Sequence, residues 1–325
     1  MLLEVKDLKT YFYVKKHELR AVDGVSFSVD RGRTLGIVGE SGCGKSVTSL
    51  SILKLIDPQA GRITGGEVLF EGRDLVPLPE KEMIAIRGNE ISMIFQEPMT
   101  SLNPVFTIGY QISEAIMTHQ KVGKAEARKR SQELLELTKI PDAKRVLNNY
   151  PHQLSGGMRQ RAMIAMSLAC SPKLLIADEP TTALDVTIQA QILNLIRDVK
   201  QKLNMGLILI THDLGIIAEM ADDILVMYAG HVVEHAPVLQ LFQDPRHPYT
   251  QGLMRSKPNI LHPQERLYTI PGNVPSLYEM PRGCPFHLRC EHATERCRRE
   301  MPRMRTVAEG QSVACWLYGE EGEDQ

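Results

Sequence analysis

The segment 39–46 limits what this chain can be more than any other stretch of the sequence. It reads Gly-Glu-Ser-Gly-Cys-Gly-Lys-Ser and matches the pattern G-x-x-x-x-G-K-S/T at every fixed position. A short β-rich apolar run, 34–38, leads into the segment, and helix-like spacing follows it over 47–55. A strand, a glycine-rich loop and a helix in this order direct backbone N–H groups toward phosphate oxygens. The segment therefore predicts a nucleoside triphosphate site, and a chance glycine-rich turn is the lesser alternative.

The residue types of this loop suit different parts of the phosphate chain. Glycines let the backbone curl without side-chain clash, and Lys45 reaches the β and γ phosphates. The Ser46 hydroxyl is a ligand for Mg²⁺. The predicted contacts of the loop are Gly39, Ser41, Gly42, Cys43, Gly44, Lys45 and Ser46.

Length and charge exclude several classes of protein. With 325 residues, the chain is long enough for one large domain and a small one. Lys and Arg number 38 against 39 Asp and Glu, so no overall basic field favours a nucleic-acid partner. The charged N-terminal residues do not fit a secretory signal, and no apolar run approaches the roughly 18 residues that span a membrane. We expect a cytosolic chain whose six cysteines are ligands or buried side chains rather than disulfides.

Strand-like and helix-like segments alternate to about residue 240, which favours an α/β domain with a largely parallel sheet. Short apolar runs at 173–177 and 206–210 predict strands buried on both faces. The pattern is mostly helical over 107–161, for example at 124–137, so we expect a helical subdomain inserted in the α/β domain.

Prolines recur beyond residue 243, and the periodicity stops there. We therefore predict a nucleotide-binding domain at 1–243, with its helical subdomain at about 100–165, and a small extension at 244–325.

Two carboxylates, Asp178 and Glu179, end an apolar strand pattern, where the magnesium-binding partner of a phosphate loop belongs. Asp178 is placed to hold the Mg²⁺ hydration shell. Glu179 is placed to orient or deprotonate the attacking water. Such a pair on its own is more often a solvated turn. Because Lys45 and Ser46 lie in the same predicted domain, the pair predicts a catalytic centre.

The run Ser155-Gly156-Gly157 lies between these two elements. Its structural interpretation is a helix start capped by Ser155. The same hydroxyl, glycine N–H groups and helix end also form a second anion site. Since one chain needs only one γ-phosphate site, the run indicates a nucleotide held mainly by another subunit.

Together these residues resemble the nucleotide-binding subunits of ABC transporters. Ser155-Gly156-Gly157 looks like the signature motif of that family, with Met158 where glutamine is commonest. Further matches are Phe95-Gln96-Glu97-Pro98 for the Q-loop, Ala183-Leu184-Asp185 for the D-loop and Thr211-His212-Asp213 for the switch histidine. The resemblance covers residues 1 to about 240, with every motif in order, and implies an ATP hydrolase.

The resemblance also implies residue roles. Gln96 would link Mg²⁺ and water to the helical subdomain, His212 would contact the γ-phosphate and orient Glu179, and Asp185 would lie across a dimer interface. Without the other motifs, His212 would be read as a core histidine at a strand end. The predicted catalytic residues are Glu179, His212, Lys45 and Gln96, and the predicted Mg²⁺ residues are Ser46, Gln96 and Asp178.

An aromatic side chain near the N-terminus is expected to stack on adenine. Alignment favours Phe12, with Tyr11 and Tyr13 as alternatives, and all three could instead pack as one strand.

The segments 246–250, 270–277 and 283–286 resemble the C-terminal extension of dipeptide and oligopeptide importer ATPases. Nickel importers of the same subfamily share parts of this extension. We therefore predict an ATPase subunit that energises uptake of dipeptides or oligopeptides, with a nickel importer as the alternative. A soluble ABC-type ATPase acting on DNA or ribosomes is a rival, but such proteins usually have coiled-coil or zinc insertions or two nucleotide domains in one chain. A non-catalytic subunit is disfavoured because no catalytic motif residue is missing.

The resemblance implies several partners. These are a second ABC ATPase subunit, identical or related, two membrane permease subunits and an external peptide-binding protein. The chain would then act as a peripheral protein on the cytoplasmic face of the cell membrane.

Four cysteines fall late in the chain, with five, six and seventeen residues between successive members: Cys284, Cys290, Cys297 and Cys315. This spacing fits a structural zinc site poorly. A [4Fe-4S] cluster is similar to what some dipeptide-importer ATPases carry, and seven arginines against three glutamates over 282–305 would offset its negative charge. Zinc and reduced, packed thiols remain the alternatives. Cys43 and Cys170 are expected to fill a loop and a helix core. The predicted cofactors are ATP, Mg²⁺ and the cluster.

Overall fold

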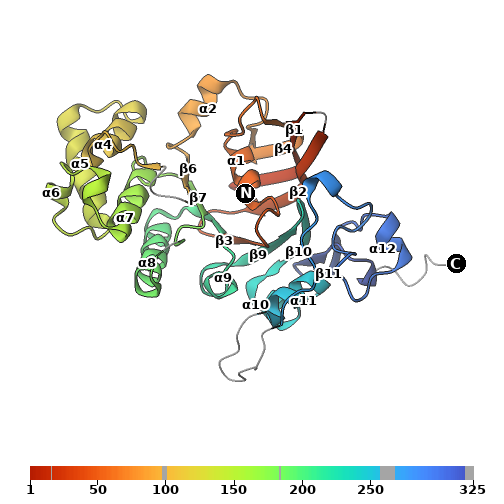
Figure 1. Ribbon diagram of the computed structural model, residues 1–325. Coiled ribbons are helices and arrows are strands. Elements are labelled where there is room, and N and C mark those ends of the chain that lie inside the picture. The colour runs from red at the N-terminus through yellow and green to blue at the C-terminus, as the bar shows by residue number, and fades with distance from the viewer. Residues whose placement is uncertain (16, 97–100, 183, 257–267, 319–325) are drawn as a thin grey trace. The chain divides into compact units, whose positions relative to one another are not determined.

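The computed structural model describes residues 1–15, 17–96, 101–182, 184–256 and 268–318 (Figure 1). These residues form two compact units. The first comprises the described residues within Met1–Leu2, Val29–Thr34 and Pro77–Ile210. The second comprises the described residues within Leu3–Ser28, Leu35–Val76 and Thr211–Gln325.

Three parallel strands lie at the centre of the first unit. β6 (Ile91–Ile94) pairs with β7 (Leu174–Asp178), and β7 pairs with β8 (Gly206–Ile210). All residues of these strands are buried, which explains why their sequences are nearly continuous apolar runs. The parallel direction brings the carboxyl ends of β6 and β7 to the same edge.

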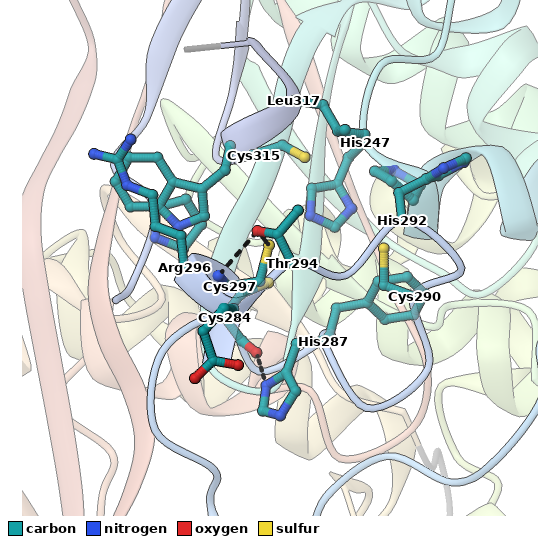
Figure 2. A pocket seen from close by; sticks show the side chains of 15 residues that line it. His247, Cys284, His287, Cys290, His292, Thr294, Arg296, Cys297, Cys315 and Leu317 are labelled. Atoms are coloured by element: carbon teal, nitrogen blue, oxygen red, sulfur yellow. Dashed lines mark hydrogen bonds between the residues drawn. The ribbon is translucent and has the colours of Figure 1, made fainter. Parts of the chain in front are cut away.

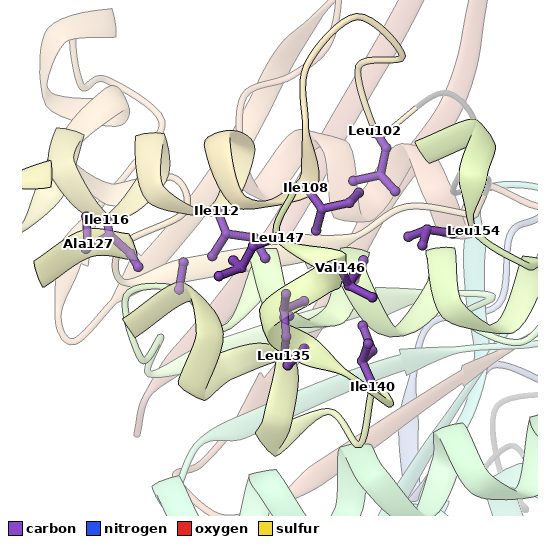
Figure 3. Packing of buried hydrophobic residues seen from close by; sticks show 14 of the residues in the cluster. Leu102, Ile108, Ile112, Ile116, Ala127, Leu135, Ile140, Val146, Leu147 and Leu154 are labelled. Atoms are coloured by element: carbon purple, nitrogen blue, oxygen red, sulfur yellow. The ribbon is translucent and has the colours of Figure 1, made fainter. Parts of the chain in front are cut away.

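The first unit also contains the predicted helical subdomain. Its helices are α4 (Ile108–His119), α5 (Lys124–Leu137), α6 (Ala143–Val146) and α7 (Gly156–Ser167). Their apolar faces meet in one core, which Figure 3 shows from close by. The larger buried members are Leu102, Ile108, Ile112, Ile116, Leu135, Ile140, Val146, Leu147 and Leu154. The helical pattern read from the sequence is therefore confirmed, and α5 has the predicted bounds.

Cys170 belongs to the same core, as expected, but it lies in the turn after α7 rather than in the helix. The unit is completed by α2 (Glu80–Ile86), the short 3₁₀ helix η1 (Pro151–Gln153) and α8 (Val186–Leu203).

The main strands of the second unit are both parallel and antiparallel. β3 (Thr34–Val38) runs parallel to β9 (Asp223–Tyr228), and β9 pairs antiparallel with β10 (His231–Pro237). β12 (Gln311–Val313) and β11 (Arg305–Ala308) follow in antiparallel order. The C-terminal extension therefore adds two strands beside β10.

A second, antiparallel sheet occupies the N-terminal part of this unit. Its strand order is β2 (His17–Val29), β1 (Leu3–Val14), β4 (Gly61–Phe70) and β5 (Arg73–Asp74). The α/β class is confirmed, but the expected alternation of strands and helices from the start of the chain misses this sheet.

The helices of the second unit are short. They are α1 (Lys45–Ile52), α9 (Leu214–Met220), α10 (Val238–Gln243), α11 (Pro248–Arg255) and α12 (Glu295–Arg299). In the described part of the extension there are also two short 3₁₀ helices, η2 (Leu277–Glu279) and η3 (Trp316–Tyr318). Within the described residues, no helix combines the length and the apolar character that crossing a membrane requires.

A buried carboxylate attaches the extension to β10. Glu234 has no exposed surface, and its Oε1 accepts hydrogen bonds from the Arg246 backbone N at 2.8 Å and from Gln311 Nε2 at 2.9 Å. Its Oε2 accepts a hydrogen bond from the His247 backbone N at 2.8 Å. A carboxylate without such donors would be costly to bury, so these contacts fix how the chain leaves α10.

Leu135→Ala should destabilise the helical subdomain. Leu135 is 0% exposed in the core of Figure 3, and truncation would remove apolar contacts and leave a cavity. We expect a loss of about 2–5 kcal/mol in the free energy of unfolding, measured by urea denaturation. Leu239→Ala, the same change at a side chain that is 73% exposed, is the control. Equal stability of the two variants would contradict this account of the core.

His247 should make stability depend on pH. Its Nδ1 accepts a hydrogen bond from the Tyr249 backbone N at 3.0 Å, and burial lowers the pKa of His247 to about 3. In the unfolded chain, His247 takes up a proton below about pH 6.5, whereas in the folded chain it stays neutral down to about pH 3. The free energy of unfolding therefore falls as the pH drops through this window, by up to about 1.4 kcal/mol per pH unit.

Denaturation at pH 7.5 and 5.5 measures this loss. His247→Asn keeps an acceptor at the start of α11 but cannot take up the proton, so its stability should fall less between the two pH values than that of the wild type. His152→Asn, at an exposed histidine, is the matched control. An identical pH response of wild type and His247→Asn would exclude His247 as the source.

Candidate functional site

The phosphate loop of the second unit connects β3 to α1, as predicted. Gly44 precedes α1 with φ of 98°, and a Cβ there would lie 2.4 Å from the Ala21 carbonyl oxygen. A Cβ at Gly39 would lie 2.2 Å from the Met227 carbonyl oxygen. Backbone atoms cannot move aside cheaply, so the path of the loop requires glycine at both positions.

Lys45 lies inside the loop. Its side chain is buried, and Nζ donates hydrogen bonds to the carbonyl oxygens of Gly39 at 2.8 Å and Glu40 at 3.0 Å. Cys43 is buried against the same ammonium group, with Sγ 3.7 Å from Nζ, which confirms that it fills the loop. Ser41 and Gly42 are exposed, so the outer side of the loop is open to a ligand. The loop thus presents backbone and a fixed positive charge to an anion.

The predicted carboxylates lie in the first unit. Asp178 is the last residue of β7 and is buried, whereas Glu179 is half-buried. Glu179 has φ of 46°, in the left-handed region, and its backbone N donates to the Ile210 carbonyl oxygen at 2.9 Å. This turn points the two side chains in different directions at the end of the strand.

Two neighbours hold the Glu179 carboxylate. Its Oε2 accepts hydrogen bonds from Gln96 Nε2 at 3.0 Å and from Thr182 Oγ1 at 2.9 Å. The structure therefore brings together Gln96 and Glu179, which are 83 residues apart in the sequence. Thr182 was not among the predicted site residues. Its position three residues after Glu179 is the local signal that could have indicated it.

Ser155 caps the N-terminus of α7, as its sequence context predicts. Its side chain accepts a hydrogen bond from the Met158 backbone N at 3.4 Å. Ser155 and Gly156 are exposed, and a Cβ at Gly156 would meet no atom within 4 Å. The positive end of this helix is therefore accessible.

Asp185 caps the N-terminus of α8, the next helix of this unit. Its Oδ1 accepts a hydrogen bond from the Ile188 backbone N at 2.9 Å. Gly157 packs closely on α8, because a Cβ there would lie 3.1 Å from Ile188. The starts of α7 and α8 are thus neighbours. Glu97, Pro98 and Ala183 of the predicted motifs lie outside the described residues.

His212 of the second unit is exposed in a bend directly after β8, so its interpretation as a core histidine is wrong. The neighbouring Asp213 caps the N-terminus of α9 and accepts a hydrogen bond from the Gly215 backbone N at 2.7 Å. The position suits a side chain that meets a ligand rather than the protein core.

The three candidate aromatics lie on β1. Phe12 is half-buried, and its ring passes close to Gly61. Tyr11 donates a hydrogen bond to Asp23 at 2.8 Å, and the guanidinium of Arg20 lies over its ring. Tyr13 is exposed. Because Tyr11 already interacts with Asp23 and Arg20, Phe12 is a better candidate than Tyr11 for stacking on adenine.

All four late cysteines line one cavity of about 300 Å³ in the second unit (Figure 2). His247, His287, His292 and Phe286 line it as well. Two of its cysteines are joined through the backbone, because the Cys284 N donates to the Cys297 carbonyl oxygen at 2.8 Å. Gly283 permits this approach, since a Cβ there would lie 2.4 Å from that oxygen. Cysteines that are far apart in the sequence therefore face a common space.

Burial favours the neutral thiol at Cys284, Cys290 and Cys315 of this cavity. Burial raises the pKa of Cys284 to about 12 and that of Cys315 to about 11, and it also raises the pKa of Cys290. Within the described ranges, no three His, Cys, Asp or Glu side chains are arranged to hold a metal ion. The arrangement therefore differs from a preformed metal site of any kind, in which the ligands already converge on the metal.

Comparison with known proteins places these motifs in a family. The family described as "ABC transporter" matches residues 22–182, and the one described as "Oligopeptide/dipeptide transporter, C-terminal region" matches residues 233–297. The chain is 56% identical to "Probable peptide ABC transporter ATP-binding protein y4tR" of Sinorhizobium fredii, across 98% of this chain and 96% of that protein. It is 53% identical to "Dipeptide transport ATP-binding protein DppD" of Escherichia coli, across 97% of this chain and 96% of that protein.

A solved structure gives the same result. The ATP-binding cassette MJ0796, in a dimeric, post-hydrolysis state bound to ADP and Pi, is 27% identical, with a TM-score of 0.65. The match covers 73% of this chain and 98% of that one. The resemblance read from the motifs is confirmed: the chain belongs to the ATP-binding proteins of ABC transporters and is an ATP hydrolase.

Proposed function

We propose that this protein is the ATP-hydrolysing subunit of a membrane importer for dipeptides or oligopeptides. The observation that carries the proposal is the combination of two matches in one chain, the ABC transporter family over 22–182 and the peptide-transporter C-terminal region over 233–297. The family region supplies ATP hydrolysis. The C-terminal match and the peptide-transport names of the relatives support the substrate class.

In this proposal, the phosphate loop binds ATP. The N–H groups of the loop and Lys45 contact the phosphates, and Ser46 and Asp178 hold Mg²⁺ directly or through water. The burial of Asp178 at the end of β7 and the fixed position of Lys45 support these roles. Phe12 is the proposed adenine contact.

Glu179 is the proposed base for the attacking water. Its carboxylate already accepts hydrogen bonds from Gln96 and Thr182, which fix its orientation. A carboxylate held in this way can receive a proton from water or align it for attack on the γ-phosphate. Gln96 is proposed to link Mg²⁺ and water to the helical subdomain, and the exposed His212 to contact the γ-phosphate and orient Glu179.

A second ATPase subunit would complete each site. The accessible start of α7, with Ser155, Gly156 and Gly157, supports binding to a nucleotide on a partner subunit. Asp185 is proposed to lie at the same interface. Closure of two subunits on ATP would move their helical subdomains and thereby two membrane permease subunits.

The remaining partner is an external peptide-binding protein that delivers the substrate. The chain itself would then be a peripheral protein on the cytoplasmic side of the membrane. We propose the domain boundary at 243/244, close to where α10 ends.

We also propose that Cys284, Cys290, Cys297 and Cys315 hold a [4Fe-4S] cluster. The common cavity of about 300 Å³ supports this, because a cluster binds each cysteine through a different iron and so needs ligands that surround a space. Binding would replace thiol protons and draw the side chains inward. Arginines nearby would offset the negative charge of the thiolates.

Glu179→Gln should abolish transport without abolishing ATP binding. The amide keeps the size of the side chain but cannot accept a proton, so we expect hydrolysis to fall by about 10²–10⁴-fold. Vesicles containing the permeases and peptide-loaded binding protein should take up peptide with the wild type and not with this variant. Glu133→Gln, the same change at an exposed site on α5, is the control. Near-normal turnover would remove Glu179 from the base role, and ATPase stimulation by a non-peptide solute alone would refute the substrate class.

Iron and sulfide analysis tests the cluster. Protein purified without oxygen should contain about four irons and four sulfides per chain and should absorb visible light. Cys315→Ser should lower the iron content, whereas Cys170→Ser, in the helical core, should not. A colourless, iron-free wild type would rule out the cluster, and zinc at one equivalent would support the alternative.

A further inference from the structure

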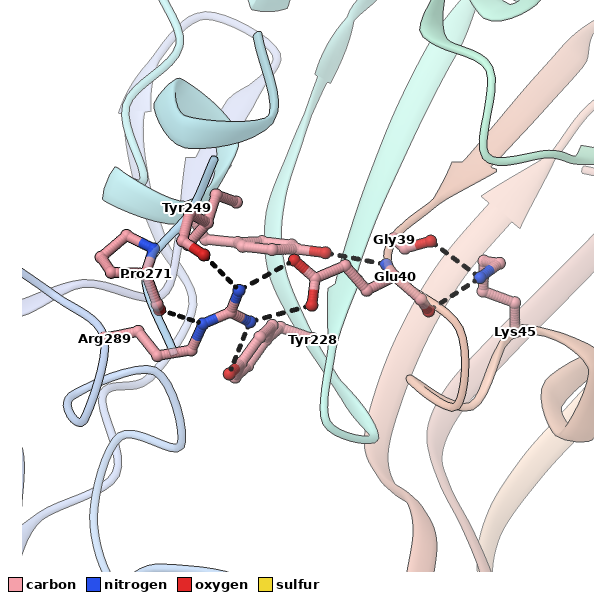
Figure 4. Close-up of polar contacts among 8 residues, drawn as sticks. Gly39, Glu40, Lys45, Tyr228, Tyr249, Pro271 and Arg289 are labelled. Carbon is pink, nitrogen blue, oxygen red and sulfur yellow. Dashed lines mark hydrogen bonds and ion pairs between the residues drawn. The ribbon is translucent and has the colours of Figure 1, made fainter. Parts of the chain in front are cut away.

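A buried arginine of the C-terminal extension holds the phosphate loop. Arg289 forms a two-pronged ion pair with Glu40, the second residue of the loop (Figure 4). Nη1 lies 2.8 Å from Oε2 of Glu40, and Nη2 lies 3.2 Å from Oε1. The Arg289 side chain is only 5% exposed, and that of Glu40 is 29% exposed. The two residues are 249 positions apart, so this contact joins the extension to the nucleotide-binding loop.

The other donors of Arg289 are also used. Nε donates to the Pro271 carbonyl oxygen at 2.9 Å, Nη2 to the Ile270 carbonyl oxygen at 3.3 Å and Nη1 to the Tyr228 hydroxyl at 3.3 Å. Burial lowers the pKa of Arg289, but the hydrogen bonds with Glu40 and Tyr228 outweigh this effect and raise it above its ordinary value. The guanidinium is therefore charged and fixed in orientation.

The extension holds the backbone of the same loop residue. The Glu40 N–H donates a hydrogen bond to the Tyr249 hydroxyl at 2.8 Å. Tyr249 has no exposed surface, and its ring packs against those of Tyr228 and Phe286 at centroid distances of 4.7 and 5.4 Å. The Glu40 carbonyl oxygen in turn accepts a hydrogen bond from Lys45 Nζ. Both the side chain and the backbone of Glu40 are thus fixed, and Lys45 is bound to the fixed residue.

The charge of Glu40 explains why the arrangement matters. A carboxylate in a loop that binds a triphosphate would repel the ligand, and a flexible one would also let the loop change shape. The bidentate pair neutralises this carboxylate and turns it toward Arg289 and away from Lys45 (Figure 4).

We propose that Arg289 is a positioning residue for nucleotide binding, which acts through Glu40 by masking its charge and fixing the phosphate loop. In this chain the C-terminal extension therefore sets how tightly ATP binds. The inference requires neither the peptide substrate nor the iron–sulfur cluster. It concerns nucleotide binding by the isolated full-length chain, so its failure is distinct from failure of the proposed transport function.

Arg289→Met and the double variant Glu40→Gln/Arg289→Met test the proposal. The single variant leaves a partly buried, unpaired carboxylate in the phosphate loop, and we expect the Kd for Mg-ATP and the KM to rise about tenfold or more, with kcat changed much less. The double variant removes the unpaired charge and should recover most of the lost affinity. The increase in Kd caused by Arg289→Met should also shrink at high salt, because the repulsion is screened.

Two further variants control for general loss of structure. Arg130→Met breaks an exposed ion pair with Glu126 on α5 and should leave Kd and KM unchanged. Tyr249→Phe removes only the hydroxyl that accepts the Glu40 N–H, and it should raise Kd severalfold even if Arg289→Met does not fold. Thermal melting monitors folding in each case.

The outcomes are distinct. Recovery in the double variant supports charge masking. A double variant that binds ATP as weakly as Arg289→Met, or folded variants of Arg289 and Tyr249 that both bind ATP like the wild type, would overturn the proposal.

Discussion

The backbone of the phosphate loop lies so close to neighbouring strands that two of its positions exclude any side chain. Gly39 lies against Met227 of β9, and Gly44 lies against Ala21 of β2. The loop is therefore fixed between strand backbones, and Lys45 is bound inside it by two carbonyl oxygens. The helix α1, the ammonium group and the open outer side of the loop all take their positions from this close packing.

A different constraint sets the positions of the polar site residues in the first unit. The carboxyl ends of parallel strands meet at one edge of the sheet, and Gln96 and Glu179 follow adjacent strands at that edge. Their hydrogen bond arises because β6 and β7 end at the same edge. Thr182 adds a donor from the turn that follows. A carboxylate with two donors in fixed positions is oriented before any ligand binds, as the proposed role of Glu179 as a base would require.

Local signals predicted much of this structure. Short apolar runs predicted the bounds of β3 and β8, and helical spacing predicted those of α5. The helix cap at Ser155 was predictable because serine is strongly preferred at helix N-caps. Pairing between distant segments carries no such signal. Two examples are the antiparallel pairing of β1 with β4 and the ion pair between Arg289 and Glu40. Both depend on the tertiary fold, which brings distant segments together. The convergence of four widely spaced cysteines on one cavity could be expected only from a family resemblance.

The pairing of β10 with β12 joins the C-terminal extension to the sheet of the nucleotide-binding region. Without the extension, β10 would be an edge strand with unpaired backbone groups, and the buried carboxylate of Glu234 would lose its donors at Arg246, His247 and Gln311. A chain shortened at residue 243 would therefore be prone to aggregation through an exposed sheet edge. The extension is therefore better regarded as an integral part of the folded ATPase than as a removable module.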